Sequence, residues 1–158
     1  MEKLRTGNIG CGKVGDFHAT VYAELPQSEF VAVCDADSAR AEAFASRYGV
    51  KAYTDVATMC RDARLDVVSI CTPHPLHASP AVAAADCGCN VLVEKPQASS
   101  LEDCDAIIAA EKRNHVTVCT MVQRRFYRPC MRIHKAIEDG KLGRPVLGMV
   151  TMLGWRDE

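Results

Sequence analysis

The stretch "TGNIGCGKVGDFH", residues 6–18, decides the fold. It follows a short apolar run and carries Gly10, Gly12 and Gly15 in the pattern G-x-G-x-x-G. Glycine weakens both strands and helices, so three glycines at a strand–helix junction need a physical reason. Such glycines allow a tight turn, close approach of a ligand and close helix–strand packing, which places phosphates on free amides at a helix N-terminus. A tight turn without a ligand is the alternative, and the position between strand and helix favours dinucleotide binding.

Apolar runs alternate with helical patterns along most of the chain. Strands are expected at residues 4–9, 30–35, 51–53, 65–72, 90–96 and 115–122, and helices at 16–25, 38–48, 56–63, 80–87 and 100–113. Ser38, Ser79 and Ser99 are the expected N-caps, the last in a capping box with Glu102. Strands that alternate with helices, and that are apolar along their whole length, predict an α/β fold, a doubly wound parallel sheet of the Rossmann type over residues 1–123.

The last part of the chain has a different pattern. One helix is expected over residues 128–139 and one apolar strand over 144–158, with no partner strand after it. An unpaired apolar strand needs another strand beside it. Residues 124–158 are therefore expected to be the connecting helix and first strand of a second, incomplete α+β open-sheet domain.

Composition excludes several classes of function. The chain has 158 residues, 48% of them hydrophobic, and a net charge of -1, which gives no field to attract nucleic acid or an anionic membrane. No apolar stretch approaches the roughly 18 residues of a membrane span, and the first strand begins too early for a leader peptide, so a cytoplasmic location is expected. The nine cysteines are scattered without a C-x-x-C motif. They are expected to be free core residues, with no metal site.

Asp35 ends the second expected strand, 25 residues after Gly10. A carboxylate at this position accepts hydrogen bonds from the ribose hydroxyls of NAD and repels the 2′-phosphate of NADP. Arg40 lies close by and would soften that repulsion. A strand-end aspartate in an ordinary turn is the alternative.

Two further loops, "CTPHPLH" and "VEKP", follow strands and belong to the same edge of the sheet. Lys95 is a candidate to exchange a proton with a substrate hydroxyl, although Glu94 and Lys95 could also form a surface ion pair. His74 and His77 could equally cap the next helix, and His18 is expected to be a packed histidine. The basic stretch "QRRFYRP", residues 123–129, is interpreted as a linker or a cofactor contact, rather than as a nucleic-acid patch.

In this order and spacing, "GNIGCGKVGDFHA", "CDADSARAEAFA", "CTPHPLHA", "VLVEKPQASSLEDCDAII" and "QRRFYRP" resemble the N-terminal half of the Gfo/Idh/MocA family, which includes glucose–fructose oxidoreductases and inositol dehydrogenases. The resemblance implies an NAD-dependent oxidoreductase that transfers a hydride to or from a hydroxyl of a small sugar, cyclitol or related polyol. It also implies a homo-oligomer formed through the sheet of the second domain.

The resemblance further implies that Lys95 is the catalytic lysine and that coenzyme contacts come from a set of residues along the chain. These are Gly10, Gly12, Lys13, Val14, Gly15, Asp35, Arg40, Thr72, Pro73, His74, His77, Glu94, Lys95, Pro96 and Gln123. NAD is expected as the cofactor and NADP is less favoured. Because the family also uses second-domain residues, this chain is expected to bind NAD but to turn over sugar poorly. An NAD-dependent glycosidase of the same family and a non-catalytic nucleotide-sensing domain stay open as alternatives.

Overall fold

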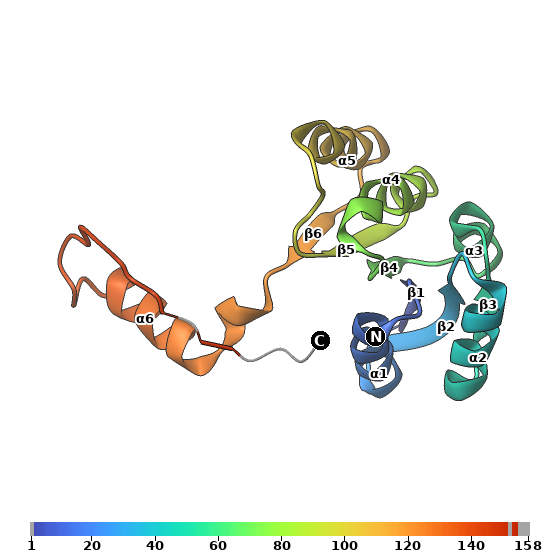
Figure 1. Cartoon of the computed structure of the whole chain (residues 1–158), viewed down its shortest axis with the longest axis horizontal. Coiled ribbons are helices and arrows are strands. Elements are labelled where there is room, and N and C mark those ends of the chain that lie inside the picture. Colours follow the sequence, from blue (N-terminus) through green and yellow to red (C-terminus); the bar gives the residue numbers. More distant parts are fainter. Residues whose placement is uncertain (1, 152, 155–158) are drawn as a thin grey trace. The chain divides into compact units, whose positions relative to one another are not determined.

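The computed structural model describes residues 2–151, 153 and 154, and divides into two compact units, Met1–Met121 and Val122–Glu158. In the first unit, strands and helices alternate (Figure 1). The strands are β1 (Leu4–Ile9), β2 (Ser28–Cys34), β3 (Lys51–Tyr53), β4 (Val67–Ile70), β5 (Asn90–Glu94) and β6 (Val118–Met121). The helices are α1 (Lys13–Glu24), α2 (Ser38–Tyr48), α3 (Val56–Asp62), α4 (Ala78–Asp86) and α5 (Leu101–Asn114), with a 3-10 turn η1 (His74–Leu76) before α4.

All six strands form one parallel sheet in the order β3-β2-β1-β4-β5-β6. The chain starts in the middle of the sheet, builds outward to β3 and then crosses to β4 on the other side of β1. This confirms the predicted doubly wound Rossmann architecture. In such sheets a ligand crevice is expected where the strand order reverses, which here is at the carboxyl ends of β1 and β4.

Helices cover both faces of the sheet, and each face has its own apolar core. On β2, Val33 packs with Ala19 of α1 and Phe44 of α2, whereas Ala32 and Cys34 belong to the core beneath α3, α4 and α5. Because side chains alternate along a strand, the continuous apolar run of β2 serves both cores. The sequence pattern therefore agrees with a sheet that is covered by helices on both faces.

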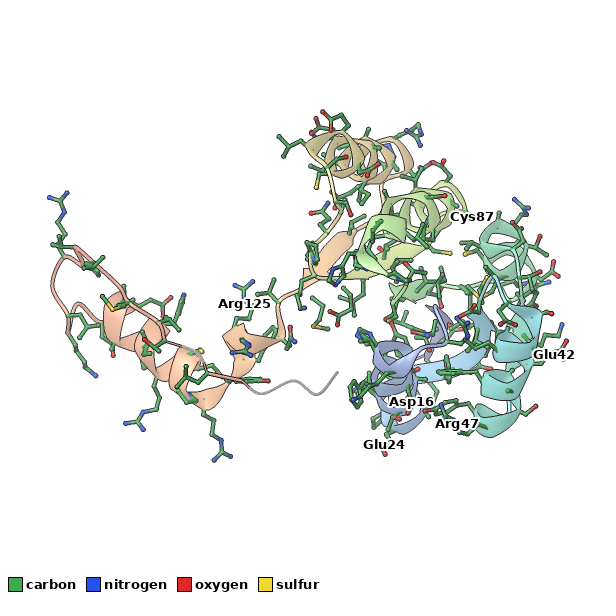
Figure 2. All side chains as sticks on the ribbon, viewed as in Figure 1. Asp16, Glu24, Glu42, Arg47, Cys87 and Arg125 are labelled. Atoms are coloured by element: carbon green, nitrogen blue, oxygen red, sulfur yellow. The ribbon has the colours of Figure 1, made fainter. Side chains whose placement is uncertain are left out.

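The two helices on the first face are linked by an ion pair. Figure 2 labels Asp16 of α1 and Arg47 of α2, and the Arg47 guanidinium pairs with the Asp16 carboxylate. The Tyr48 hydroxyl donates to the backbone oxygen of Asp16 at 3.3 Å. These contacts fix α1, whose N-terminus lies at the crevice, against α2.

The three expected serine caps are wrong by one or two residues. Asp37 caps α2 and accepts a hydrogen bond from the Arg40 amide, while Ser100, not Ser99, caps α5. At α4 the N-cap position is His77, with no side-chain cap hydrogen bond. An aspartate or a second serine next to the expected cap is an equally good acceptor, so residue type alone does not fix the position.

The second unit contains a 3-10 turn η2 (Gln123–Phe126) and one helix, α6 (Arg128–Glu138). The expected strand over residues 144–158 is not observed: residue 144 is a bend, residues 145–151, 153 and 154 have no regular structure, and residues 152 and 155–158 lie outside the described residues. Val146, Leu147 and Leu153 are more than four-fifths exposed. A strand requires a hydrogen-bonded partner, and none pairs with this segment among the described residues.

Within the described residues, no helix is long and apolar enough to cross a membrane.

Candidate functional site

A crevice of about 780 Å³ opens at the carboxyl ends of β1, β2 and β4. The β1–α1 turn, the end of β2, η1 and the head of α4 form its walls. Nine of the predicted contact residues line it: Gly10, Gly12, Lys13, Val14, Asp35, Arg40, Thr72, Pro73 and His74. The structure therefore brings together loops that are distant in the sequence, at the place where the strand order reverses.

Each of the three glycines of the β1–α1 turn lacks a side chain for a different structural reason. Gly10 has φ +97°, and a Cβ there would lie 2.7 Å from the Cys71 carbonyl carbon. A Cβ on Gly15 would lie 2.0 Å from the Gly10 oxygen, whereas a Cβ on Gly12 would meet nothing within 4 Å. Gly10 and Gly15 are thus required by the fold, and Gly12 is the glycine whose missing side chain leaves room in the crevice.

Asn8 braces this turn from below, a role that the sequence analysis missed. It is fully buried, its Nδ2 donates to the Gly10 oxygen at 2.9 Å, and its Oδ1 accepts from the Cys71 thiol at 3.4 Å. The available signal was a lone amide in the middle of an otherwise apolar strand. Buried amides need hydrogen-bond partners, and here the backbone of the turn and the neighbouring thiol supply them.

Asp35 connects the glycine turn to the end of β2. Its Oδ2 accepts from the Cys11 amide at 2.9 Å, and its Oδ1 accepts from the Asp37 amide at 3.0 Å and the Arg40 guanidinium at 3.4 Å. A carboxylate offers about four lone-pair sites, so three protein donors leave room for one more donor. Its side chain is 10% exposed and lines the crevice. The geometry suits the recognition of one hydroxyl.

Three buried thiols lie at or just after the carboxyl ends of β1, β2 and β4. Burial, and then the Asp35 carboxylate, raise the pKa of the Cys11 thiol to about 12. Burial also raises the pKa of Cys34, to about 11, and that of Cys71. These thiols are therefore neutral packing groups at physiological pH, and all nine cysteines of the chain are free.

The end of β5 carries a polar network that reaches into α1. Nε2 of His18 lies 3.0 Å from Oε1 of Glu94, and Nδ1 of His18 lies 3.0 Å from the Ser69 hydroxyl. The Ser69 hydroxyl in turn lies 2.7 Å from that of Tyr22, whose pKa is raised by burial. The Lys95 amide donates to the other Glu94 oxygen at 3.2 Å. His18 was expected only as a packed histidine, and the structure shows that it holds Glu94.

Lys95 and Pro96 follow β5 and are exposed, and the peptide bond between them is cis. In the part of the chain that the structure describes, no side chain pairs with the Lys95 ammonium. Gln123 belongs to the second unit, in η2. Neither Glu94 nor Lys95 is part of the crevice wall.

His77 is fully buried and does not line the crevice. Its Nδ1 lies 2.7 Å from the Pro96 carbonyl oxygen and its Nε2 lies 2.9 Å from the Thr72 carbonyl oxygen. It therefore lies behind the wall that Thr72 and His74 form, between two loops of the site.

A metal site is not formed by the described residues, among which no group of three His, Cys, Asp or Glu side chains is arranged to hold an ion.

Residues 4–122 match a family model, GFO_IDH_MocA, described as an oxidoreductase family with an NAD-binding Rossmann fold. The chain is 32% identical to D-apiose dehydrogenase of Paraburkholderia graminis over 96% of its own length and 40% of the relative's. It is 30% identical to myo-inositol 2-dehydrogenase of Thermotoga maritima, over 94% of its length and 45% of the relative's.

Among solved structures, the chain resembles the WlbA dehydrogenase of Bordetella pertussis in complex with NADH and UDP-GlcNAcA. The TM-score is 0.85 at 28% identity, over 90% of this chain and 44% of that one. The chain thus spans less than half the length of each of these proteins.

Proposed function

Because the chain belongs to the Gfo/Idh/MocA oxidoreductase family, we propose that it is the coenzyme-binding part of a dehydrogenase acting on a sugar, cyclitol or related polyol. Its matched portion is the NAD-binding Rossmann fold of that family. D-apiose and myo-inositol 2-dehydrogenases among its relatives support the substrate class. They favour a dehydrogenase over the glycosidase and the sensing domain.

The observation that carries this proposal is the open space at Gly12 beside the carboxylate of Asp35 in one crevice. Gly12 is the N-cap of α1 and makes no side-chain cap hydrogen bond, so amides of the first turn are available to a diphosphate. Asp35 retains one acceptor site for a ribose hydroxyl. The residues present therefore fit NAD.

Each remaining contact residue has a proposed role. Lys13, Val14, Thr72, Pro73 and His74 form the walls along the coenzyme. Arg40 pairs with Asp35 from the rim of the crevice, and its guanidinium is available to an additional phosphate. Bound NAD supplies the hydride acceptor.

At the end of β5, Glu94 and Lys95 are proposed to lie at the reacting end, with Lys95 exchanging the proton of the substrate hydroxyl. Pro96 and Gln123 are proposed as further contacts of the coenzyme.

The chain by itself is proposed to bind NAD without appreciable turnover. Hydride transfer requires the substrate carbon to be held against the nicotinamide, and the relatives have more than half of their length beyond the matched region. Residues 124–158 are proposed to begin the second domain, whose sheet would supply the other wall and the homo-oligomer contacts. Nine free thiols support a reducing, cytoplasmic location.

Calorimetry tests the proposal. The folded chain, checked by circular dichroism, is titrated with NAD, NADH and NADP, and saturable binding with preference for the NAD forms is expected. Absence of heat with all three coenzymes would overturn it. In a parallel assay with a panel of polyols, turnover near 1 s⁻¹ or above, the range of ordinary enzymes, would refute the claim that the other wall is needed.

A further inference from the structure

We infer that His77 is a positioning residue that holds two loops of the site together, and that it does so as a doubly protonated imidazolium. Both ring nitrogens face backbone carbonyl oxygens, that of Thr72 at 2.9 Å and that of Pro96 at 2.7 Å. Carbonyl oxygens only accept hydrogen bonds, and a neutral imidazole has only one N–H. Both contacts are hydrogen bonds only when both nitrogens carry a proton.

His18 differs from His77 in the partners of its ring nitrogens. Nδ1 of His18 faces the Ser69 hydroxyl, which either donates or accepts, so His18 has satisfied partners with one proton or with two. His77 has no such freedom. It is fully buried, so water does not replace a missing donor, and a lone pair opposite a carbonyl oxygen at hydrogen-bond distance would be repulsive.

The two carbonyl groups belong to different loops of the site. Thr72 lines the crevice directly after β4, and its hydroxyl donates to the Leu76 carbonyl at 2.8 Å, which closes the loop on itself. Pro96 follows Lys95 directly after β5. A bridge from Thr72 to Pro96 therefore couples the crevice wall to the backbone that carries the proposed catalytic lysine. This part of the inference rests on the proposed function.

Deprotonation removes one of the two bonds, so the bridge weakens as pH rises. Other titratable residues on the surrounding elements are His74, whose ring centre lies 5.7 Å from that of His77, Cys71 after β4, Glu94 and Lys95 at the end of β5, and Asp86 at the far end of α4. His74 carries the same imidazole group as His77 and lies next to it. Its contribution must therefore be separated by experiment.

Nitrogen-15 NMR of the histidine side chains gives a direct readout. Long-range proton–nitrogen spectra of the labelled chain distinguish an imidazolium from either neutral tautomer, and the His77→Gln variant assigns the signal. At pH 6 we expect both His77 nitrogens to be protonated, with Nε2 or Nδ1 losing its proton at higher pH. A single protonated nitrogen from pH 5.5 to 8 would overturn the inference.

Coenzyme affinity gives the second readout. In the wild type and in His74→Gln, NAD affinity is expected to fall by about tenfold as His77 loses its second proton, the effect of losing one hydrogen bond to a charged group. In His77→Gln, which keeps one donor, affinity should be low and independent of pH over this range. A pH-dependent loss that persists in His77→Gln would overturn the coupling.

The two proposals fail in different ways. An imidazolium at His77 in a chain that binds no coenzyme would contradict the proposed function and leave the bridge intact. In that case, amide hydrogen exchange at residues 72–77 and 95–98 should still quicken in step with the His77 titration, beyond the general increase seen in α2. Unchanged relative exchange would contradict the bridge.

Discussion

Nε2 of His18 lies 3.0 Å from Oε1 of Glu94, and this contact joins the first helix to the end of β5. Both side chains are largely buried, at 11% and 15% exposure. Ser69 holds the opposite nitrogen of His18, so the ring cannot turn away without losing a second bond. The Glu94 carboxylate is thereby fixed one residue before Lys95.

His18→Leu is expected to lower the free energy of unfolding by about 2 kcal/mol, because it leaves a buried carboxylate without its main donor. His18→Gln keeps a donor and should lose less. Urea unfolding measures both. The control is His134→Leu, which breaks the exposed His134–Glu138 pair in α6 and should change stability by less than about 0.5 kcal/mol. Equal stability of His18→Leu and wild type would show that the network contributes nothing.

Much of this site could be predicted because its signals are local. The glycine pattern, the apolar runs and Asp35 at a strand end each refer to one stretch of chain, and a parallel sheet then brings them to one edge. The roles of Asn8, His18 and His77 depend on which strands and loops become neighbours. His18 meets Glu94 across 76 residues and His77 meets Pro96 across 19, so no local pattern indicates these contacts.

The errors also have physical causes. Expected caps at Ser38 and Ser99 moved by one residue because Asp37 and Ser100 offer equivalent acceptors. The apolar segment after residue 144 has the composition of a strand, but pairing is a property of two segments, and the described residues supply no partner.

Substitutions at Gly12 and Gly15 should separate the requirements of coenzyme binding from those of folding. Gly12→Ala adds a methyl group to open space, so we expect a normal unfolding curve together with an NAD affinity lowered by about tenfold or more. Gly15→Ala forces a methyl group to within 2.0 Å of the Gly10 oxygen and should cost about 3 kcal/mol of stability. Calorimetry and urea unfolding are measured on both variants. Loss of stability in Gly12→Ala, or full affinity in it, would contradict the assignment of Gly12 to the ligand.

Asp35 and Arg40 should govern the choice between coenzymes. Asp35→Ala removes the acceptor for the ribose hydroxyl, so NAD affinity should fall about tenfold or more. It also removes the repulsion of a 2′-phosphate, so the ratio of NAD affinity to NADP affinity should become smaller. Arg40→Ala is the matched control, because the Arg40 side chain is 56% exposed and pairs with Oδ1 of Asp35 at 3.4 Å. It should leave NAD affinity within about twofold and weaken NADP. Equal losses of NAD affinity in the two variants would count against recognition by Asp35.

The cysteines predict a graded response to thiol reagents and to alkaline pH. Cys119 and Cys130 are exposed and should react with a disulfide reagent in the native chain at pH 8. Half-buried Cys87, labelled in Figure 2, and Cys104 should follow slowly, and all nine thiols should react after denaturation. Cys11 should remain protected, because its pKa is raised from 9.0 to about 12.

The same pKa shift fixes the sign of a stability change. Below pH 9 the thiol is protonated in both the folded and the unfolded chain, and its contribution is fully present. Between pH 9 and about 12 the unfolded chain releases the proton and the folded chain retains it, so stability falls as pH rises, by about 1.4 kcal/mol per pH unit for each such thiol. Urea midpoints at pH 8 and 10.5 should therefore differ less in Cys11→Ala than in wild type. An identical shift in both would mean that Cys11 ionises equally easily in the folded chain.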